Sequence, residues 1–393
     1  MRFTLITVLL SLISAVELTG QSSIDSVLSN IAKNNKTIIA NTKYRDAKIL
    51  EYKSGLNPNN PKVEYEYLMG KPANAGDQTD FLITQSFDFP TAYLRKKQLS
   101  KEQEKLAEIE MNTIRQDILL DAKLVCIDLI YQNKLHTELS NRKQNAEKWL
   151  DAFQRSLEVG DGNIMDVNKT KLQLLEINTT LQENISNLNQ LNQKLTELNG
   201  GIPIHFSDTL YASHSMIPEF NALENEIEVK DLVLKYLEQE KVIGQNEIAL
   251  SKSLTLPKID VGYRYQTFLG ERFNGVHFSL TIPLWENKNR VKTKQSELIM
   301  NEANLQEHIN EHYFDIKQKY EQMTNLKISL DEYETVFSNL NNIELLDKSL
   351  SLGQISTIEY FMEMTFYYVA LQNYLKIEME YNKVVAELYK FQL

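Results

Sequence analysis

The stretch Leu256-Pro257-Lys258-Ile259-Asp260-Val261-Gly262-Tyr263 decides the fold, because apolar and polar side chains alternate along it directly after a proline. A period of two places alternate side chains on opposite faces of a β-strand. The run from Val276 to Ile282 alternates in the same way, and the segment from Gly270 to Gly275 connects the two runs. We therefore expect a β-hairpin with residues 258–266 and 276–282 as its strands.

The same pattern occurs earlier in the chain. The stretch Asn60-Pro61-Lys62-Val63-Glu64-Tyr65-Glu66-Tyr67 resembles residues 256–263, and a second alternating run, residues 81–89, follows a connection from Gly70 to Asp80. Further along, residues 155–160 resemble residues 348–353, in the same order and at nearly the same spacing. Such internal similarity predicts two structural repeats, residues 21–203 and residues 204–393.

Residues 1–20 have the features of a secretory signal peptide. Arg2 precedes an uncharged apolar run from Phe3 to Val16, and the small residue Gly20 precedes Gln21. The run is shorter than the roughly 20 residues that a membrane-spanning helix needs, so we expect cleavage after Gly20. No later segment is long and apolar enough for such a helix, so a mature chain that crosses a membrane must use β-strands.

Composition narrows the class of protein further. The 393 residues include 42 Lys and Arg against 53 Asp and Glu, and the net charge of -11 argues against nucleic acid as a partner. A single cysteine, Cys126, excludes an intrachain disulfide framework and a multi-cysteine metal cluster, and we expect it to be a packed small residue. With only 13 Gly and 8 Pro, long uninterrupted elements are favoured.

Long helical patterns follow both hairpins. Residues 90–159 contain no Gly and no Pro after Pro90, and residues 283–352 repeat the design with apolar side chains at heptad-like spacing. Two return helices, residues 163–199 and 356–391, follow the turns at Gly160 and Gly353. Such amphipathic helices are typical of coiled-coil packing. The expected fold class is mainly α, with two β-hairpins.

Each hairpin has two interpretations. A soluble antiparallel sheet also alternates, whereas Tyr- and Phe-rich faces and strands near about 9–11 residues suit a bilayer. Four strands leave two open edges, which lipid cannot satisfy, and the smallest closed membrane barrels use about eight strands. If these strands enter a membrane, several chains have to share one barrel. His277, on the polar face, is expected to be solvated or to line the lumen.

The order of these features resembles that of the TolC-like outer-membrane efflux proteins, the outer membrane factor family. Residues 279–284, Ser-Leu-Thr-Ile-Pro-Leu, are similar to the family's passage from strand to helix. Residues 157–167 and 350–360 are similar to its two helical tips, each with a hydrophobic residue, a glycine, a small polar residue and an acid. The resemblance covers essentially the whole mature chain.

This resemblance implies a homotrimer in the cell outer membrane. Three chains would contribute four strands each to a twelve-stranded transmembrane β-barrel, and the long helices would form an α-barrel in the periplasm. It also implies that the tips contact a periplasmic adaptor bound to an inner-membrane pump, through Leu157, Gly160, Leu350 and Gly353. The implied function is passive conduction of substrates through a tripartite efflux system. A periplasmic coiled-coil scaffold or adaptor without a pore is the alternative.

By the same resemblance, Asp166 and Glu359 match the family's acidic position at the tunnel constriction. A second acid, which the family has three residues after Glu359, is Met362 here, and Glu363 follows one place later. The alternative for both acids is a structural role, because carboxylates in the first turn of a helix are favoured by its dipole.

One short motif suggests an enzyme. His308-Ile309-Asn310-Glu311-His312 matches the H-x-x-E-H pattern of some zinc peptidases, in which two histidines one turn apart bind metal beside a catalytic acid. Such patterns arise by chance in polar helices, and this one lies within a heptad-patterned helix with no evident cleft. We therefore expect no catalytic role and no metal site, and incidental metal binding is the lesser alternative. We expect no enzymatic activity and no cofactor. The aromatic residues Phe361, Phe366, Tyr367 and Tyr368 are expected to pack between helices.

Overall fold

The computed structural model describes residues 19–212, 217–338 and 342–393. Residues 1–18, which carry most of the expected signal peptide, lie outside the described residues. The chain forms two compact units, and each takes segments from both halves of the sequence. Unit 1 comprises the residues up to Ile39, Ile114–Val229 and Tyr313–Leu393, and unit 2 comprises Ala40–Thr113 and Lys230–His312.

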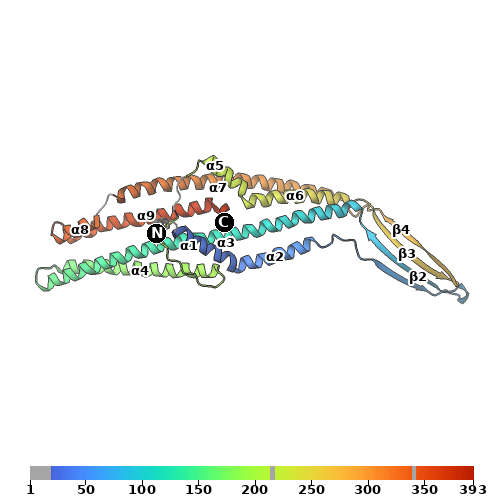
Figure 1. Cartoon of the computed structure of the whole chain (residues 1–393), viewed down its shortest axis with the longest axis horizontal. Helices are drawn as coiled ribbons and strands as arrows, with labels where there is room; N and C mark the ends of the chain where they lie inside the picture. The colour runs from blue at the N-terminus through green and yellow to red at the C-terminus, as the bar shows by residue number, and fades with distance from the viewer. Residues whose placement is uncertain (1–18, 213–216, 339–341) are drawn as a thin grey trace, which may run out of the picture. The chain divides into compact units, whose positions relative to one another are not determined.

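Unit 1 is helical. Its elements, some of which continue into unit 2, are α1 (Thr19–Asn34), α3 (Pro90–Glu158), α4 (Ile164–Leu198), α5 (Phe220–Lys230), α7 (Arg290–Ser338), α8 (Asn342–Ser351), α9 (Thr357–Leu388) and the short helix η2 (Lys390–Gln392). α3 and α4 form an antiparallel hairpin (Figure 1), since Asp121 pairs with Lys194 and Gln132 with Asn184. None of the helices in the described ranges combines the length and the apolar character needed to cross a membrane.

Unit 1 contains two large apolar cores and two smaller ones. The first joins α1, α3 and α4 around the fully buried Ile31, Leu129 and Leu195, and the second joins α5, α7 and α9 around Leu223 and Met323. Cys126 is fully buried in the first core, which confirms the expected packing role.

A row of three ion pairs connects α3 to the C-terminal end of unit 1. Their side-chain atoms lie 2.5 to 2.6 Å apart, in the pairs Asp117–Lys390, Asp128–Lys383 and Lys134–Glu378. The order of these partners along the chain shows that α3 and α9 run antiparallel.

Unit 2 combines a small sheet with helices. It contains most of α2 (Lys36–Tyr52), the first part of α3, α6 (Leu232–Ser253), the first part of α7 and four strands. The strands are β1 (Lys62–Leu68), β2 (Gln78–Phe87), β3 (Lys258–Phe268) and β4 (Glu271–Thr281), and a short helix, η1 (Ala73–Ala75), lies between β1 and β2. Ion pairs at 3.2 and 2.9 Å, Lys241–Glu302 and Lys294–Glu247, hold α6 and α7 antiparallel.

The two hairpins form one antiparallel sheet in the order β1-β2-β3-β4. The pairing of β2 with β3, in which Phe81 lies opposite Tyr265, joins the two halves of the sequence. The register places apolar side chains in rows across one face, and these are Val63, Tyr65, Phe81, Ile83, Ile259, Val261, Tyr263, Tyr265, Val276, Phe278 and Leu280. β1 and β4 are the edges of this sheet, and Figure 1 shows β2, β3 and β4 side by side.

Two expected boundaries were wrong. β4 begins at Glu271, because Leu269 and Gly270, with φ of 52° and 85°, form a two-residue turn instead of the expected six-residue connection. The helix expected from Pro283 begins at Arg290, because the Asn287 side chain donates to the Leu254 carbonyl at 2.7 Å and holds a non-helical turn before it. The remaining strands and return helices lie where the sequence predicts them, within a few residues.

Candidate functional site

The turns at Gly160 and Gly353 have the same hydrogen bonding. The amide of Gly160 donates to the Leu157 carbonyl at 3.1 Å, and the amide of Gly353 donates to the Leu350 carbonyl at 3.0 Å. In both turns the next amide donates to the carbonyl five residues back, at 3.0 and 2.9 Å. This pair of bonds is the Schellman motif, which ends a helix with a left-handed residue. The φ angles of 85° and 70° explain the two glycines.

The helix after each turn begins with a side-chain cap and an acid at its third position. Asn163 accepts from the amide of Met165 at 2.9 Å at the start of α4. At the start of α9, Ser356 and Glu359 form a reciprocal capping box, in which the Ser356 amide donates to Glu359 at 2.8 Å. Both acids therefore lie in the first turn of a helix, as the structural alternative expects. Glu359 also takes part in the cap, whereas no hydrogen bond or ion pair links the half-buried Asp166 carboxylate to another described side chain.

Apolar side chains are exposed at both tips. The exposed fractions are 74% for Val159 and 61% for Leu352, one residue before each glycine. Leu157 is half-buried and Leu350 is buried, so these two predicted contact residues support the turns more than they offer surface.

A buried polar cluster joins α3 to α8 and α9 near the tips. The Tyr360 hydroxyl donates to Asp347 at 2.7 Å and accepts from Asn145 at 3.0 Å and from the Trp149 indole at 3.1 Å. Burial and the Asp347 carboxylate raise the pKa of Tyr360, so the phenol stays protonated and can donate. This cluster is the most extensive set of polar contacts near the tips, and it fixes the α3–α4 hairpin against the α8–α9 turn.

A cation–π contact also joins α3 to α9. The Arg142 guanidinium lies 3.8 Å from the ring centroid of Tyr368 and also pairs with Glu138 at 3.0 Å. Tyr367 contacts the ring of Phe337, as expected for helix packing. Phe366, however, is 66% exposed, so the expectation of packing was wrong for this residue.

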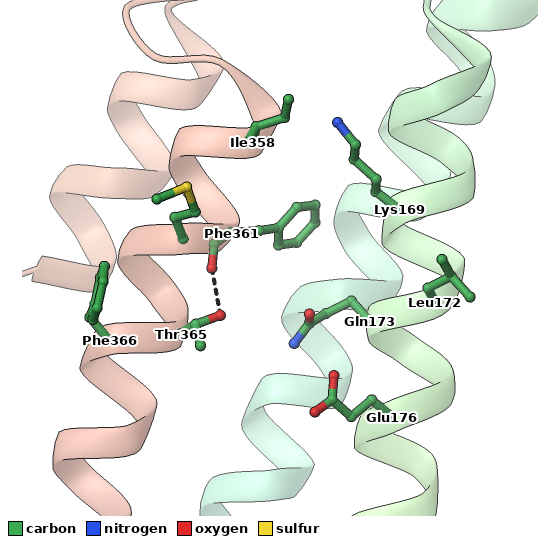
Figure 2. A pocket seen from close by; sticks show the side chains of 9 residues that line it. Lys169, Leu172, Gln173, Glu176, Ile358, Phe361, Thr365 and Phe366 are labelled. Atoms are coloured by element: carbon green, nitrogen blue, oxygen red, sulfur yellow. Dashed lines mark hydrogen bonds between the residues drawn. The ribbon is translucent and has the colours of Figure 1, made fainter.

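A groove of about 430 Å³ lies between α4 and α9, next to the tips. Figure 2 shows Phe361 directed from α9 toward α4, with Lys169 and Ile358 at one end of the groove and Glu176 on the α4 side. Leu172, Met362 and Phe366 complete its apolar lining. Met362 occupies the position at which the TolC-like family has a second acid, and here it is part of the apolar lining of the groove.

The other face of the sheet is largely polar. Arg264 on β3 forms a bidentate pair with Asp80 on β2, and Ser86 is hydrogen-bonded to Asp260. His277 lies on this face and is half-buried. The sheet therefore has one apolar and one polar side over its central rows.

The H-x-x-E-H motif lies on α7, within unit 2. Glu311 is exposed, and no group of three or more His, Cys, Asp or Glu side chains is gathered for a metal ion within the described residues. The His308 and His312 rings stack on one another.

Sequence reasoning missed the Trp149–Tyr360 cluster, because its α3 residues, Asn145 and Trp149, lie 198 to 215 residues from their partners along the chain. The sequence shows aromatic residues that can form hydrogen bonds, Trp149 and Tyr360, near the two predicted turns. It does not show which of these side chains contact one another.

No family model and no curated protein sequence matches the chain. Solved channel structures match its fold. CusC, whose crystal structures follow folding and transmembrane channel formation, is 13% identical, with a TM-score of 0.71 over 96% of this chain and 95% of that chain. The CmeC outer membrane channel of Campylobacter jejuni is 15% identical, with a TM-score of 0.66 over 94% of this chain and 85% of that chain. The open-state MtrE outer membrane channel of Neisseria gonorrhoeae is 10% identical, with a TM-score of 0.63 over 94% and 88%.

At these identities the similarity establishes the fold. The chain has the TolC-like fold of outer-membrane channels, with long helices and a four-stranded antiparallel sheet, and the resemblance seen in the sequence is confirmed at this level.

Proposed function

We propose that the chain is a channel of the cell outer membrane that passively conducts substrates in a tripartite efflux system. Its sheet would lie in the outer membrane and its helices would form a tunnel in the periplasm. The chain would act as a conduit and not as an enzyme.

The two-sided sheet carries this proposal. Its apolar side chains are exposed in the single chain, with exposed fractions of 83% for Val276, 66% for Phe278 and 66% for Tyr65. An apolar face opposite a polar face is what a strand needs between lipid and a water-filled lumen. The same face on a soluble protein would be a contiguous apolar patch that needs another partner.

The free edges favour a trimer. Each edge strand, β1 and β4, offers unpaired backbone groups on its outer side, and lipid cannot satisfy them. If β4 of one chain pairs with β1 of the next, three chains close a twelve-stranded barrel with no remaining edge. The fold is shared with CusC, whose structures concern transmembrane channel formation, and this supports a closed pore.

The two tips are proposed as the contact with a periplasmic adaptor, and through it with an inner-membrane pump. The matching Schellman turns at Gly160 and Gly353 and the exposed Val159 and Leu352 support this role. Asp166 is the better candidate for a constriction, because Glu359 is already engaged by Ser356. The repeated order of hairpin, long helix and return helix supports the proposal that residues 21–203 and 204–393 are two structural repeats.

The proposal is tested with the mature chain extracted from outer membranes. We expect it to fractionate with the outer membrane, to crosslink as a trimer and to produce ion conductance in planar bilayers. A chain that is monomeric and soluble without detergent would contradict the channel and support the periplasmic scaffold.

A further inference from the structure

Two histidines of α7 have stacked rings, and each ring has a buried nitrogen without a hydrogen-bond partner among the described residues. His308 and His312 are one helical turn apart, with ring centroids 5.6 Å apart and ring planes at 22°. The Nε2 atom of each ring is buried and has no hydrogen-bond partner among the described residues. Burying a polar atom without a partner is unfavourable, so this pair of nitrogens is a place where a ligand would stabilise the fold.

A carboxylate faces the pair from α6. Asp231 caps α6 by accepting from the Leu234 amide at 2.7 Å through Oδ1, which leaves Oδ2 at 4.0 Å from Nε2 of His312. The antiparallel register of α6 and α7 brings these two positions together. The side chains of His312 and Asp231 are 17% and 20% exposed, so the group is enclosed but remains in reach of solvent.

We propose that His308 and His312 bind a divalent transition-metal ion through their Nε2 atoms, with Asp231 as a carboxylate ligand. Two imidazoles at positions i and i+4 of a helix form a chelating pair, and imidazole with carboxylate suits Zn²⁺ and its neighbours Co²⁺, Ni²⁺ and Cu²⁺. Because three such side chains are not already gathered around one point within the described residues, Asp231 has to rotate toward the ion or bind it through water.

The bound ion would connect the start of α6 to α7 within unit 2. It would act as a clip and not as a catalyst, because Glu311 is exposed and not enclosed with the histidine pair. The site is independent of the channel function, since its ligands belong neither to the sheet nor to the tips.

The test uses the mature full-length chain in detergent, without a histidine tag and treated with a chelator. We expect titration with zinc chloride to show one ion bound per chain, and cobalt chloride to give the visible absorption of a site with nitrogen ligands. Replacing both imidazole ligands, His308→Gln with His312→Gln, should abolish saturable zinc binding, and Asp231→Asn should weaken it without abolishing it. His277→Gln is the matched control, because it removes a histidine from the sheet and leaves the pair intact.

A measurement without substitutions keeps the test independent of folding. Zinc should raise the thermal midpoint of the wild-type chain and protect His308 and His312 from diethylpyrocarbonate, with His277 modified as before. The proposal is overturned if the wild-type chain shows no saturable zinc binding, or if the double variant binds as tightly as the wild type.

Discussion

Replacing Val276 by arginine tests whether the apolar face of the sheet lies against lipid. Val276 is the central residue of the 11-residue strand β4, and 83% of its side chain is exposed. Its row across the sheet, with Tyr263, Ile83 and Val63, would lie near the middle of a bilayer. An arginine at that depth costs about 2–4 kcal/mol per chain, and a trimer carries the change three times. On a solvated surface the same substitution costs within about 0.5 kcal/mol.

The neighbouring residue provides the matched control. His277→Arg places the same charge one residue further along β4, on the polar face, where a water-filled lumen accepts it. Density-gradient separation of membranes and unheated gel electrophoresis measure how much folded trimer each variant forms. We expect His277→Arg to resemble the wild type and Val276→Arg to lower the ratio of folded to unfolded chains by about 30-fold or more, since 2 kcal/mol corresponds to that factor. If the two variants assemble equally, the apolar face does not contact lipid and the reasoning fails.

Three further predictions concern unit 1. Removing the buried hydroxyl by Tyr360→Phe should weaken the contact of α3 with α9 by about 2 kcal/mol and speed amide exchange at the start of α9. The control Tyr44→Phe removes an exposed hydroxyl and should leave this exchange unchanged. Equal exchange rates in the two variants would contradict the role of the cluster. Burial raises the pKa of Cys126 to about 12, so a maleimide should modify this thiol only after unfolding, and rapid labelling of the folded chain would show that the first core is open. Hydrogen bonds from Ser356 lower the pKa of Glu359 below its ordinary value of 4.5. The capping box therefore stabilises α9 fully above pH 4.5, and this stabilisation is lost as the pH falls through the lowered pKa. Amide protection factors at the start of α9 should fall over this pH range in the wild type but not in Glu359→Gln.

The sequence by itself determined the elements whose information is local. Alternation specified the strands, because apolar side chains at every second position lie on one face only when the backbone is a β-strand. Pro90 and Gly160 marked the two ends of α3 to within two residues, because a proline suits a first helical turn and a left-handed residue ends a helix. Asp166 and Glu359 were chosen from the family resemblance, and the structure places each at the third position after a helix cap.

Only the tertiary structure decided which distant residues meet. The pairing of Phe81 with Tyr265, the Trp149–Tyr360 cluster and the approach of Asp231 to His312 each join residues far apart in the sequence. Hydrophobic periodicity gives the face of a helix or strand but not the register of its partner, so many pairings share one pattern. The register of two paired elements depends on the packing and polar contacts along their whole length. Those contacts form only when the chain folds.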